Sequence, residues 1–425
     1  MQTAKQKLKR AAPWLFLLLV LAGLAAVRGL AANYEIGYEI MNGDFQNYNP
    51  VRHLLAGQVP YRDFTVYLGA GELYSVGGLL LVLGNSFGRS MFATNFCTWF
   101  YFELLVLAVC LVVIGTARAA RAAALALCSV FFAYVQGANL PFAGQVNTLL
   151  SYAAANGNSA RMMRSAALTL AVLVILLGLH FWQQDTSRRL LAPAVLVPFA
   201  AGFFVPWSND MGGAAYISIA LGYGLYLIRL YRSSIGKIVV QTLRYIVTSV
   251  VGLGVSVLLI SWGHPLAWLR QTRGTSAYQT WYYGNTLSDR VCSVADLHWP
   301  GAAVFCLAAA LAFAIGIFVC RSKRSAVLAA GGFALTLGMV LWNLLYGMVS
   351  ASNNGPTGGA AALAAVLAPA CIIKAVLLVC QKVSFPQVAA RIVPAGCAVL
   401  DILDEQTLAQ VTEKGQYLRE SIEAM

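Results

Sequence analysis

The sequence predicts an all-α protein, a polytopic membrane helix bundle of about ten transmembrane helices with a long first extracytoplasmic loop that contains interfacial helices. Mean hydropathy is +0.70, and only 11% of the 425 residues are charged, whereas charged residues make up about a quarter of a soluble domain. Apolar runs of roughly 20 residues recur along the chain, and each can cross the ~30 Å hydrocarbon layer as a helix. The first run is not expected to be a simple signal peptide, because further runs follow as far as residue 380.

The basic residues between the apolar runs predict the orientation of the spans. Lys and Arg cluster before the first run and then at alternate turns, which is the positive-inside pattern. Both chain ends are therefore expected in the cytoplasm, and the net charge of +13 is attributed to topology, so no nucleic-acid partner is expected. The predicted spans are 12–32, 90–116, 122–138, 162–182, 190–206, 211–230, 238–262, 301–320, 325–350 and 360–380.

Two shorter apolar segments are not expected to span. "LYSVGGLLLVLG" (73–84) is predicted to be an interfacial or re-entrant helix on the outer side, and "VAARIVPAGCAVL" (388–400) is expected at the inner surface. The chain is accordingly divided into a transmembrane domain, residues 1–382, and a cytoplasmic juxtamembrane segment with an amphipathic helical tail, residues 383–425.

Polar residues gather in the predicted outer loops, above all in "NGDFQNYNPVRHLLAGQVPYRDF" (42–64). Another outer loop, 263–300, mixes Trp281 and Tyr282 with Arg270 and Arg273, and a short one carries Asp210. Aromatic side chains here fit a membrane interface and equally a surface that stacks on sugar rings. No C-x-x-C, P-loop or G-x-G-x-x-G motif is present, which argues against a zinc site and against nucleotide chemistry.

The first outer loop resembles that of the GT-C superfamily of membrane glycosyltransferases. The shared pattern is an acidic residue after the first span, then R-x-L-x-x-G-x-x-P-Y-x-D-F, then a helix that leads into the second span. The matching residues here are Arg52, Leu54, Gly57, Pro60, Tyr61, Asp63 and Phe64, preceded by Asp44. The resemblance covers roughly residues 1–380, but the soluble outer domain that many members carry after the last span is not apparent.

The resemblance implies an inverting transfer of a sugar from a polyprenyl-phosphate donor to a glycan, lipid or protein acceptor outside a bacterial cytoplasmic (inner) membrane. Asp44 matches the family's catalytic acid, and Asp63 is the second catalytic candidate. Such a transfer needs a carboxylate to take the acceptor proton and cations on the leaving phosphate. The expected substrate-binding residues are Arg52, Tyr61, Arg62, Asp210, Arg270, Arg273, Trp281 and Tyr282. No cofactor is assigned, and the resemblance leaves open a divalent cation, Mg²⁺ or Mn²⁺.

Each assignment has a plainer alternative. Asp44 could cap a helix or be a solvated loop residue, and Asp63 could form a local salt bridge or turn. The arginines could contact lipid headgroups. At the level of function, the rival hypothesis is a multi-span transporter or a flippase for lipid-linked glycans, and Glu103 within the second predicted span is compatible with it. A non-catalytic scaffold explains the polar loop least well.

The C-terminal residues 396–425 change abruptly in character. They hold six of the sixteen acidic residues, and Leu408, Val411, Leu418 and Ile422 lie on or near one face of a predicted helix. This segment resembles a short slice of a class III (acetylornithine-type) aminotransferase, but nothing in the chain resembles that family's cofactor-lysine region. Pyridoxal chemistry is therefore not expected.

Overall fold

The computed structural model describes residues 4–35, 41–137, 139–154, 161–182, 191–283, 300–349 and 357–380. The described residues form a bundle of helices without a named strand. The helices are α1 (Ala4–Glu35), α2 (Met41–Leu55), α3 (Ala70–Leu83), α4 (Phe87–Ile114), α5 (Ala117–Val135), α6 (Ala143–Ala154), α7 (Arg161–Trp182), α8 (Leu191–Phe203), α9 (Met211–Tyr231), α10 (Ile235–Ile260), α11 (Pro265–Tyr283), α13 (Pro300–Val319), α14 (Lys323–Val349) and α15 (Thr357–Cys380).

Nine of the helices in these ranges are long and apolar enough to cross a membrane: α1, α4, α5, α7, α9, α10, α13, α14 and α15. The predicted span 190–206 differs, because α8 has only 13 residues and is followed by a 3-10 turn, Val205–Trp207. At about 1.5 Å per residue, α8 covers only about 20 Å. The multi-pass helical architecture is thus confirmed, with nine long apolar helices and one shorter segment in place of ten equal spans.

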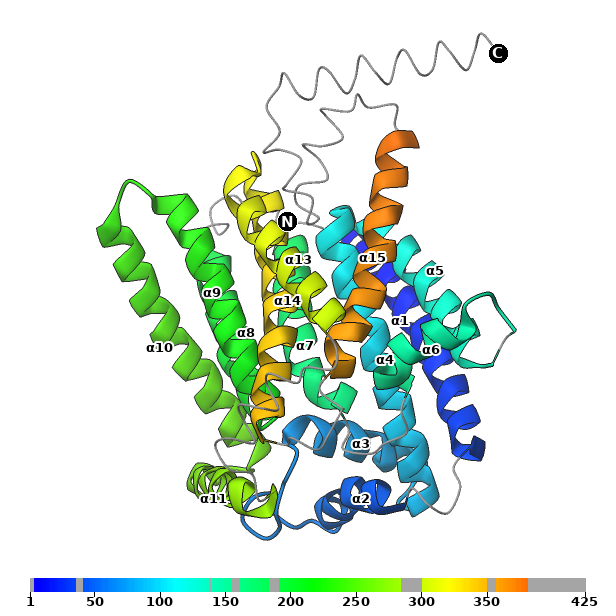
Figure 1. Ribbon diagram of the computed structural model, residues 1–425. Coiled ribbons are helices and arrows are strands. Elements are labelled where there is room, and N and C mark those ends of the chain that lie inside the picture. The colour runs from blue at the N-terminus through cyan, green and yellow to red at the C-terminus, as the bar shows by residue number, and fades with distance from the viewer. Residues whose placement is uncertain are drawn as a thin grey trace.

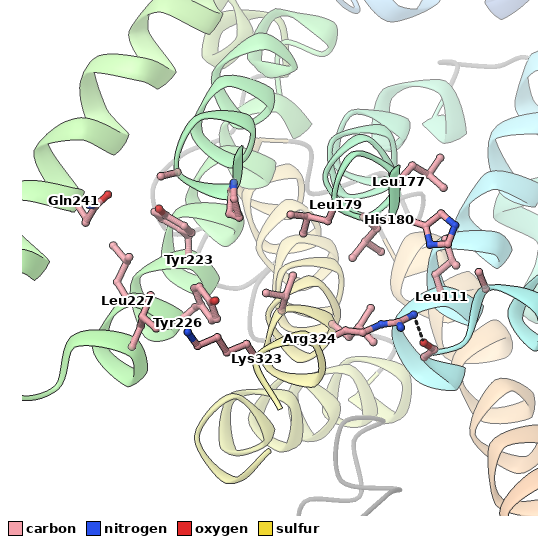
Figure 2. A pocket seen from close by; sticks show the side chains of 18 of the residues that line it. Leu111, Leu177, Leu179, His180, Tyr223, Tyr226, Leu227, Gln241, Lys323 and Arg324 are labelled. Carbon is pink, nitrogen blue, oxygen red and sulfur yellow. Dashed lines mark hydrogen bonds between the residues drawn. The ribbon is translucent and has the colours of Figure 1, made fainter. Parts of the chain in front are cut away.

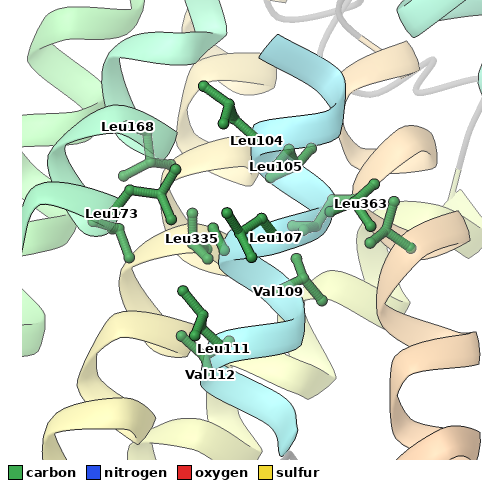
Figure 3. Close-up of a cluster of buried hydrophobic side chains, with 14 of the residues drawn as sticks. Leu104, Leu105, Leu107, Val109, Leu111, Val112, Leu168, Leu173, Leu335 and Leu363 are labelled. Carbon is green, nitrogen blue, oxygen red and sulfur yellow. The ribbon is translucent and has the colours of Figure 1, made fainter. Parts of the chain in front are cut away.

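Helix α4 forms the centre of the bundle. From Leu104 to Ile114 its side chains are all apolar, as expected for a helix that is buried on all sides, and 89% of its most apolar window is buried. Figure 3 shows Leu104, Leu107 and Leu111 of α4 among side chains from three other helices, which are Leu168 and Leu173 of α7, Leu335 of α14 and Leu363 of α15.

Basic side chains from several helices gather at one end of the bundle, here called the basic end. Arg324 donates a hydrogen bond to the Gly115 carbonyl (3.0 Å), and Lys374 donates one to the Ile114 carbonyl (2.7 Å). The guanidinium carbon of Arg121 lies 4.7 Å from the centre of the Trp14 ring. The sequence pattern therefore identified side chains that lie together in space.

The opposite end is covered by a layer of helices that we call the cap, formed by α2, α3, α11 and the segment 56–69. Figure 1 shows α3 lying across the bundle, with α2 and α11 at the same end. The helix at 73–84 is confirmed and extends over Ala70–Leu83. Within regions read as outer loops from the sequence, α2, α6 and α11 are helical.

The cap has a hydrophobic core of its own. Val51, Val66, Leu73 and Leu80 belong to a buried cluster that is separate from the bundle core. The Tyr74 hydroxyl donates a hydrogen bond to the carbonyl of Ile260 at the end of α10 (2.6 Å). These contacts give the cap a fixed position on the bundle. Residues 381–425, including the predicted tail and the aminotransferase-like segment, lie outside the described residues.

Candidate functional site

The polar stretch 42–64 folds as α2 followed by a tight turn. Helical spacing places Asp44, Asn47 and Val51 on one face, and all three are buried. The start of α2 lies beside the start of α4, because the rings of Phe45 and Phe87 stack with their centres 4.4 Å apart. An aspartate in the first turn of a helix is also favoured by the helix dipole.

Asp44 is buried without full hydrogen bonding. Its side chain is 3% exposed, and its Oδ2 atom has no hydrogen-bond partner among the described residues. Burial raises the pKa of Asp44 above the usual range of an aspartate, because removal from water disfavours the charged form. A carboxylate with a raised pKa is a better proton acceptor, and a free oxygen leaves room for the proton's donor.

Asp63 lies in a different environment. Its carboxylate accepts two hydrogen bonds from the Arg62 guanidinium (2.8 and 3.0 Å) and one from the Val59 N–H (2.8 Å). The bond from Arg62, followed by the one from Val59, lowers the pKa of Asp63 to about 2. Arg62 also reaches the His264 ring at 3.2 Å. The alternative interpretation of Asp63, a local salt bridge within a turn, therefore describes its geometry.

Tyr61 lies within the same turn, and its side chain packs into the core of the cap. It has a positive φ of 66°, which is uncommon for a residue with a side chain. Its ring belongs to the buried cluster of the cap, and burial raises the pKa of its hydroxyl. Tyr61 thus anchors the turn in the cap core.

The structure does not bring Asp44 and Asp63 together. Phe64, next to Asp63, stacks on the ring of His53 with the centres 5.4 Å apart. His53 follows Asp44 by nine residues of the same helix, which corresponds to about 14 Å along the axis. One sugar ring does not bridge that separation, so the two aspartates do not share a reacting atom in this conformation.

The predicted arginines are exposed and lie mainly on the Asp63 side of the cap. Arg270 and Arg273 lie on α11 and are exposed, and Gln271 between them donates a hydrogen bond to the Val66 carbonyl (2.9 Å). Arg52 is exposed on α2 and donates to Asn49 at 3.2 Å. Trp281 and Tyr282 fall in the last turn of α11, and their side chains lie outside the described part of the structure.

Asp210, which is partly buried, belongs to a charge cluster that spacing in the sequence does not reveal. Its carboxylate accepts hydrogen bonds from Arg164 (3.0 Å), from the Ser208 hydroxyl (2.5 Å) and from the Met211 N–H (2.8 Å). Glu72, 4% exposed, is the third member, and the charge of Arg164 acts on it. These residues come from the first turns of α3 and α7 and from the N-cap of α9. We call Glu72, Arg164 and Asp210 the cap-base cluster.

The two acids of the cap-base cluster are shifted in opposite directions. Burial raises the pKa of Glu72 to about 8, although the charge of Arg164 opposes this shift. Burial by itself would raise the pKa of Asp210. The charge of Arg164 and the hydrogen bonds from Ser208, Trp342 and Met211 outweigh burial, so the pKa is lowered. Glu72 therefore holds its proton near neutral pH, while Asp210 is ionised opposite Arg164.

Several close contacts hold the cap against the cap-base cluster. The Trp207 indole N–H donates to the Met163 carbonyl (2.9 Å), and Gly71 lies so close to the Trp207 ring that an added Cβ would overlap it. Asn209 donates to the Tyr67 carbonyl at 2.6 Å. The Asp210 region thus positions α3 and the segment 65–69, and this is the role its geometry supports.

The described residues do not contain a group of three or more His, Cys, Asp or Glu side chains that could hold a metal ion. We therefore assign no step of a reaction to Mg²⁺ or Mn²⁺.

No protein-family model matches the chain, and neither the curated proteins nor the solved structures yield a match.

Proposed function

We propose that this protein is a membrane glycosyltransferase of the GT-C type that uses a polyprenyl-phosphate sugar as donor. In the proposed reaction an acceptor hydroxyl or amide attacks C1 of the sugar, and Asp44 takes the proton of the attacking group. The bond between C1 and the phosphate oxygen breaks, and polyprenyl phosphate leaves. Attack from the face opposite the phosphate inverts the configuration at C1.

The observation that carries the proposal is the state of Asp44. A buried carboxyl with an oxygen that lacks a partner among the described residues costs stability, because burying a polar group without a hydrogen bond is unfavourable. Such a cost is common where a side chain is kept for chemistry. The location of Asp44 also supports its proposed role as the catalytic base. It lies in the cap, where we propose that a lipid-linked donor in the bilayer meets an acceptor in water.

The exposed guanidinium groups are proposed to bind the substrates. Arginine suits phosphate because its planar fork makes paired hydrogen bonds. Arg52 follows Asp44 by eight residues on α2, about 12 Å along the axis, so we propose that it contacts the donor phosphate by turning its long side chain toward the start of the helix. Arg270 and Arg273 lie on the Asp63 side of the cap, so we propose that they bind a more distant part of the donor or the acceptor.

A transfer assay tests the proposal. The purified protein is incubated with a panel of polyprenyl-phosphate sugars, and the release of polyprenyl phosphate and the formation of glycosylated product are measured by mass spectrometry. The same donors are placed in one leaflet of proteoliposomes. Turnover of at least one donor supports the transferase, whereas movement of intact donors between leaflets without turnover would replace it with the flippase hypothesis.

A further inference from the structure

A cavity of about 510 Å³ lies at the basic end of the bundle, opposite the cap. It is enclosed mainly by α7, α8, α9, α10 and α14. Figure 2 shows Lys323 and Arg324 at the start of α14, where they point to opposite sides of the helix, Lys323 toward Tyr226 of α9 and Arg324 toward the side of His180 of α7. The proposed transferase chemistry does not use this cavity.

The polar lining of the cavity is cationic. Lys323 and Arg324 are both exposed to it, and Arg324 is held in place by its hydrogen bond to the Gly115 carbonyl (3.0 Å). The charges of Arg324, Arg121 and Arg10 all act on His180, which shows that further cations lie around this wall. No Asp or Glu is among the described residues that line the cavity. A positive site without a compensating carboxylate selects an anion.

The remaining lining is apolar or amphipathic. Leu176, Leu177 and Leu227 contribute hydrocarbon surface, and Tyr223 and Tyr231 contribute rings with a polar tip. A smaller cavity of about 50 Å³ continues from the same walls between α7, α8 and α14, where Val172, Ile175 and Val197 line it. The two cavities share Tyr223, Tyr226 and Val327. A charged site thus leads directly into an apolar slot.

We propose that this cavity binds an anionic glycerophospholipid from the adjacent leaflet, with its phosphate on Lys323 and the start of an acyl chain in the apolar slot, while Arg324 adds positive charge to the same site from its place against the Gly115 carbonyl. Basic pockets between transmembrane helices are suited to acidic lipid headgroups, and an ammonium group supplies charge-assisted hydrogen bonds to phosphate oxygens. A free phosphate ion would use the cations but leave the apolar slot unfilled.

The test uses the purified full-length chain after lipid removal. Its melting temperature is measured during titration with phosphatidylglycerol, with phosphatidylcholine of the same acyl chains, and with a polyprenyl phosphate. Lys323→Gln removes one cation, and Val327→Trp narrows the junction between the two cavities without a change of charge. Arg321→Gln is the matched control, because Arg321 is an exposed cation close to Lys323 in sequence that does not line the cavity.

Phosphatidylglycerol is expected to raise the melting temperature of the wild type and of Arg321→Gln. Lys323→Gln and Val327→Trp should bind phosphatidylglycerol at least about tenfold more weakly. Lys323→Gln loses a charge-assisted contact with the phosphate, and Val327→Trp blocks the acyl chain from the apolar slot. Native mass spectrometry should show the lipid retained by the wild type. Equal stabilisation by phosphatidylcholine, or an unchanged response of Lys323→Gln, overturns the proposal. A response to polyprenyl phosphate alone overturns the choice of a glycerophospholipid. All three outcomes leave the transferase proposal standing, because that proposal depends on the cap at the opposite end of the bundle.

Discussion

The start of α2 and the turn after its end carry one aspartate each, in opposite environments. Asp44 faces inward and keeps an oxygen without a partner among the described residues, while Asp63 is exposed and bound by Arg62 and the Val59 N–H. Burial raises the pKa of Asp44, and hydrogen bonds lower that of Asp63 to about 2. Two aspartates of the same polar stretch thus differ in burial and in hydrogen bonding, and the density of charged residues in the sequence does not reveal this difference.

The largest effect is expected from the substitution Asp44→Asn, which tests whether Asp44 is the base. It keeps the size of the side chain but removes the proton acceptor, so turnover of a polyprenyl-phosphate sugar should fall by about 100-fold or more. Initial rates are measured at equal amounts of protein that elutes as a single species on gel filtration. Full activity of Asp44→Asn together with an inactive Asp63→Asn would move the base to Asp63, and full activity of both would refute the transferase role of this loop.

The raised pKa of Glu72 predicts that the stability of the fold depends on pH. Its folded pKa, about 8, lies above the unfolded value of about 4.3, so the folded state keeps a proton that the unfolded state has released. The contribution of Glu72 to stability should therefore be greatest below about pH 4 and fall as pH rises toward 8, by at most a factor of about ten in the unfolding equilibrium per pH unit. The lowered pKa values of Asp63 and Asp210 act in the opposite direction at low pH.

Thermal melts at several pH values measure this slope. Glu72→Gln cannot ionise, so its stability should lose that part of the pH dependence. A slope that is identical in the wild type and in Glu72→Gln would assign the dependence to other groups.

The substitution Asp63→Asn should have a smaller effect. The carboxylate is exposed and already occupied by its neighbours, so kcat is expected to change by no more than about threefold, which is typical of a surface position. Arg62→Lys keeps the charge but loses the paired contact with Asp63, and it serves as the matched variant. A loss of turnover comparable to that of Asp44→Asn would show that the turn takes part in the reaction.

The smallest effect is expected from a deletion at the opposite end of the chain. Removal of residues 401–425 should leave membrane insertion and transfer activity unchanged, because both ends of the chain are expected on the side away from the cap. Activity and membrane yield are compared with the full-length protein. A loss of activity at unchanged yield would give the tail a function.

Hydropathy predicted most of the architecture, because a 20-residue apolar run has few alternatives to a membrane helix. It failed for the polar segments. Helices α6 and α11 occur where the sequence suggested loops, since their stability depends on packing against the cap and the bundle and not on an apolar run. The predicted span 190–206 is also divided in the structure, into α8 and the 3-10 turn Val205–Trp207.

The candidate site was only partly predictable. The resemblance identified Asp44, but its burial depends on how α2 packs against α3 and α4. The cap-base cluster joins residues 72, 164 and 210, which no local spacing connects. A signal did exist, because Glu72 and Arg164 are charged residues within or beside apolar stretches, where an ionisable residue is expensive and is kept for a reason.

The packing of α8 has a consequence for biogenesis. Gly202 of α8 faces the backbone of Ser249, and Gly252 of α10 faces the backbone of Phe199, so closely that an added Cβ would overlap either carbonyl. Small residues allow this approach between membrane helices. A helix of 13 residues is a poor anchor when it leaves the translocon alone. We therefore expect α8 to be held in the bilayer only after α10 has been synthesised, so that this part of the protein matures as a pair of helices and not in the order of translation.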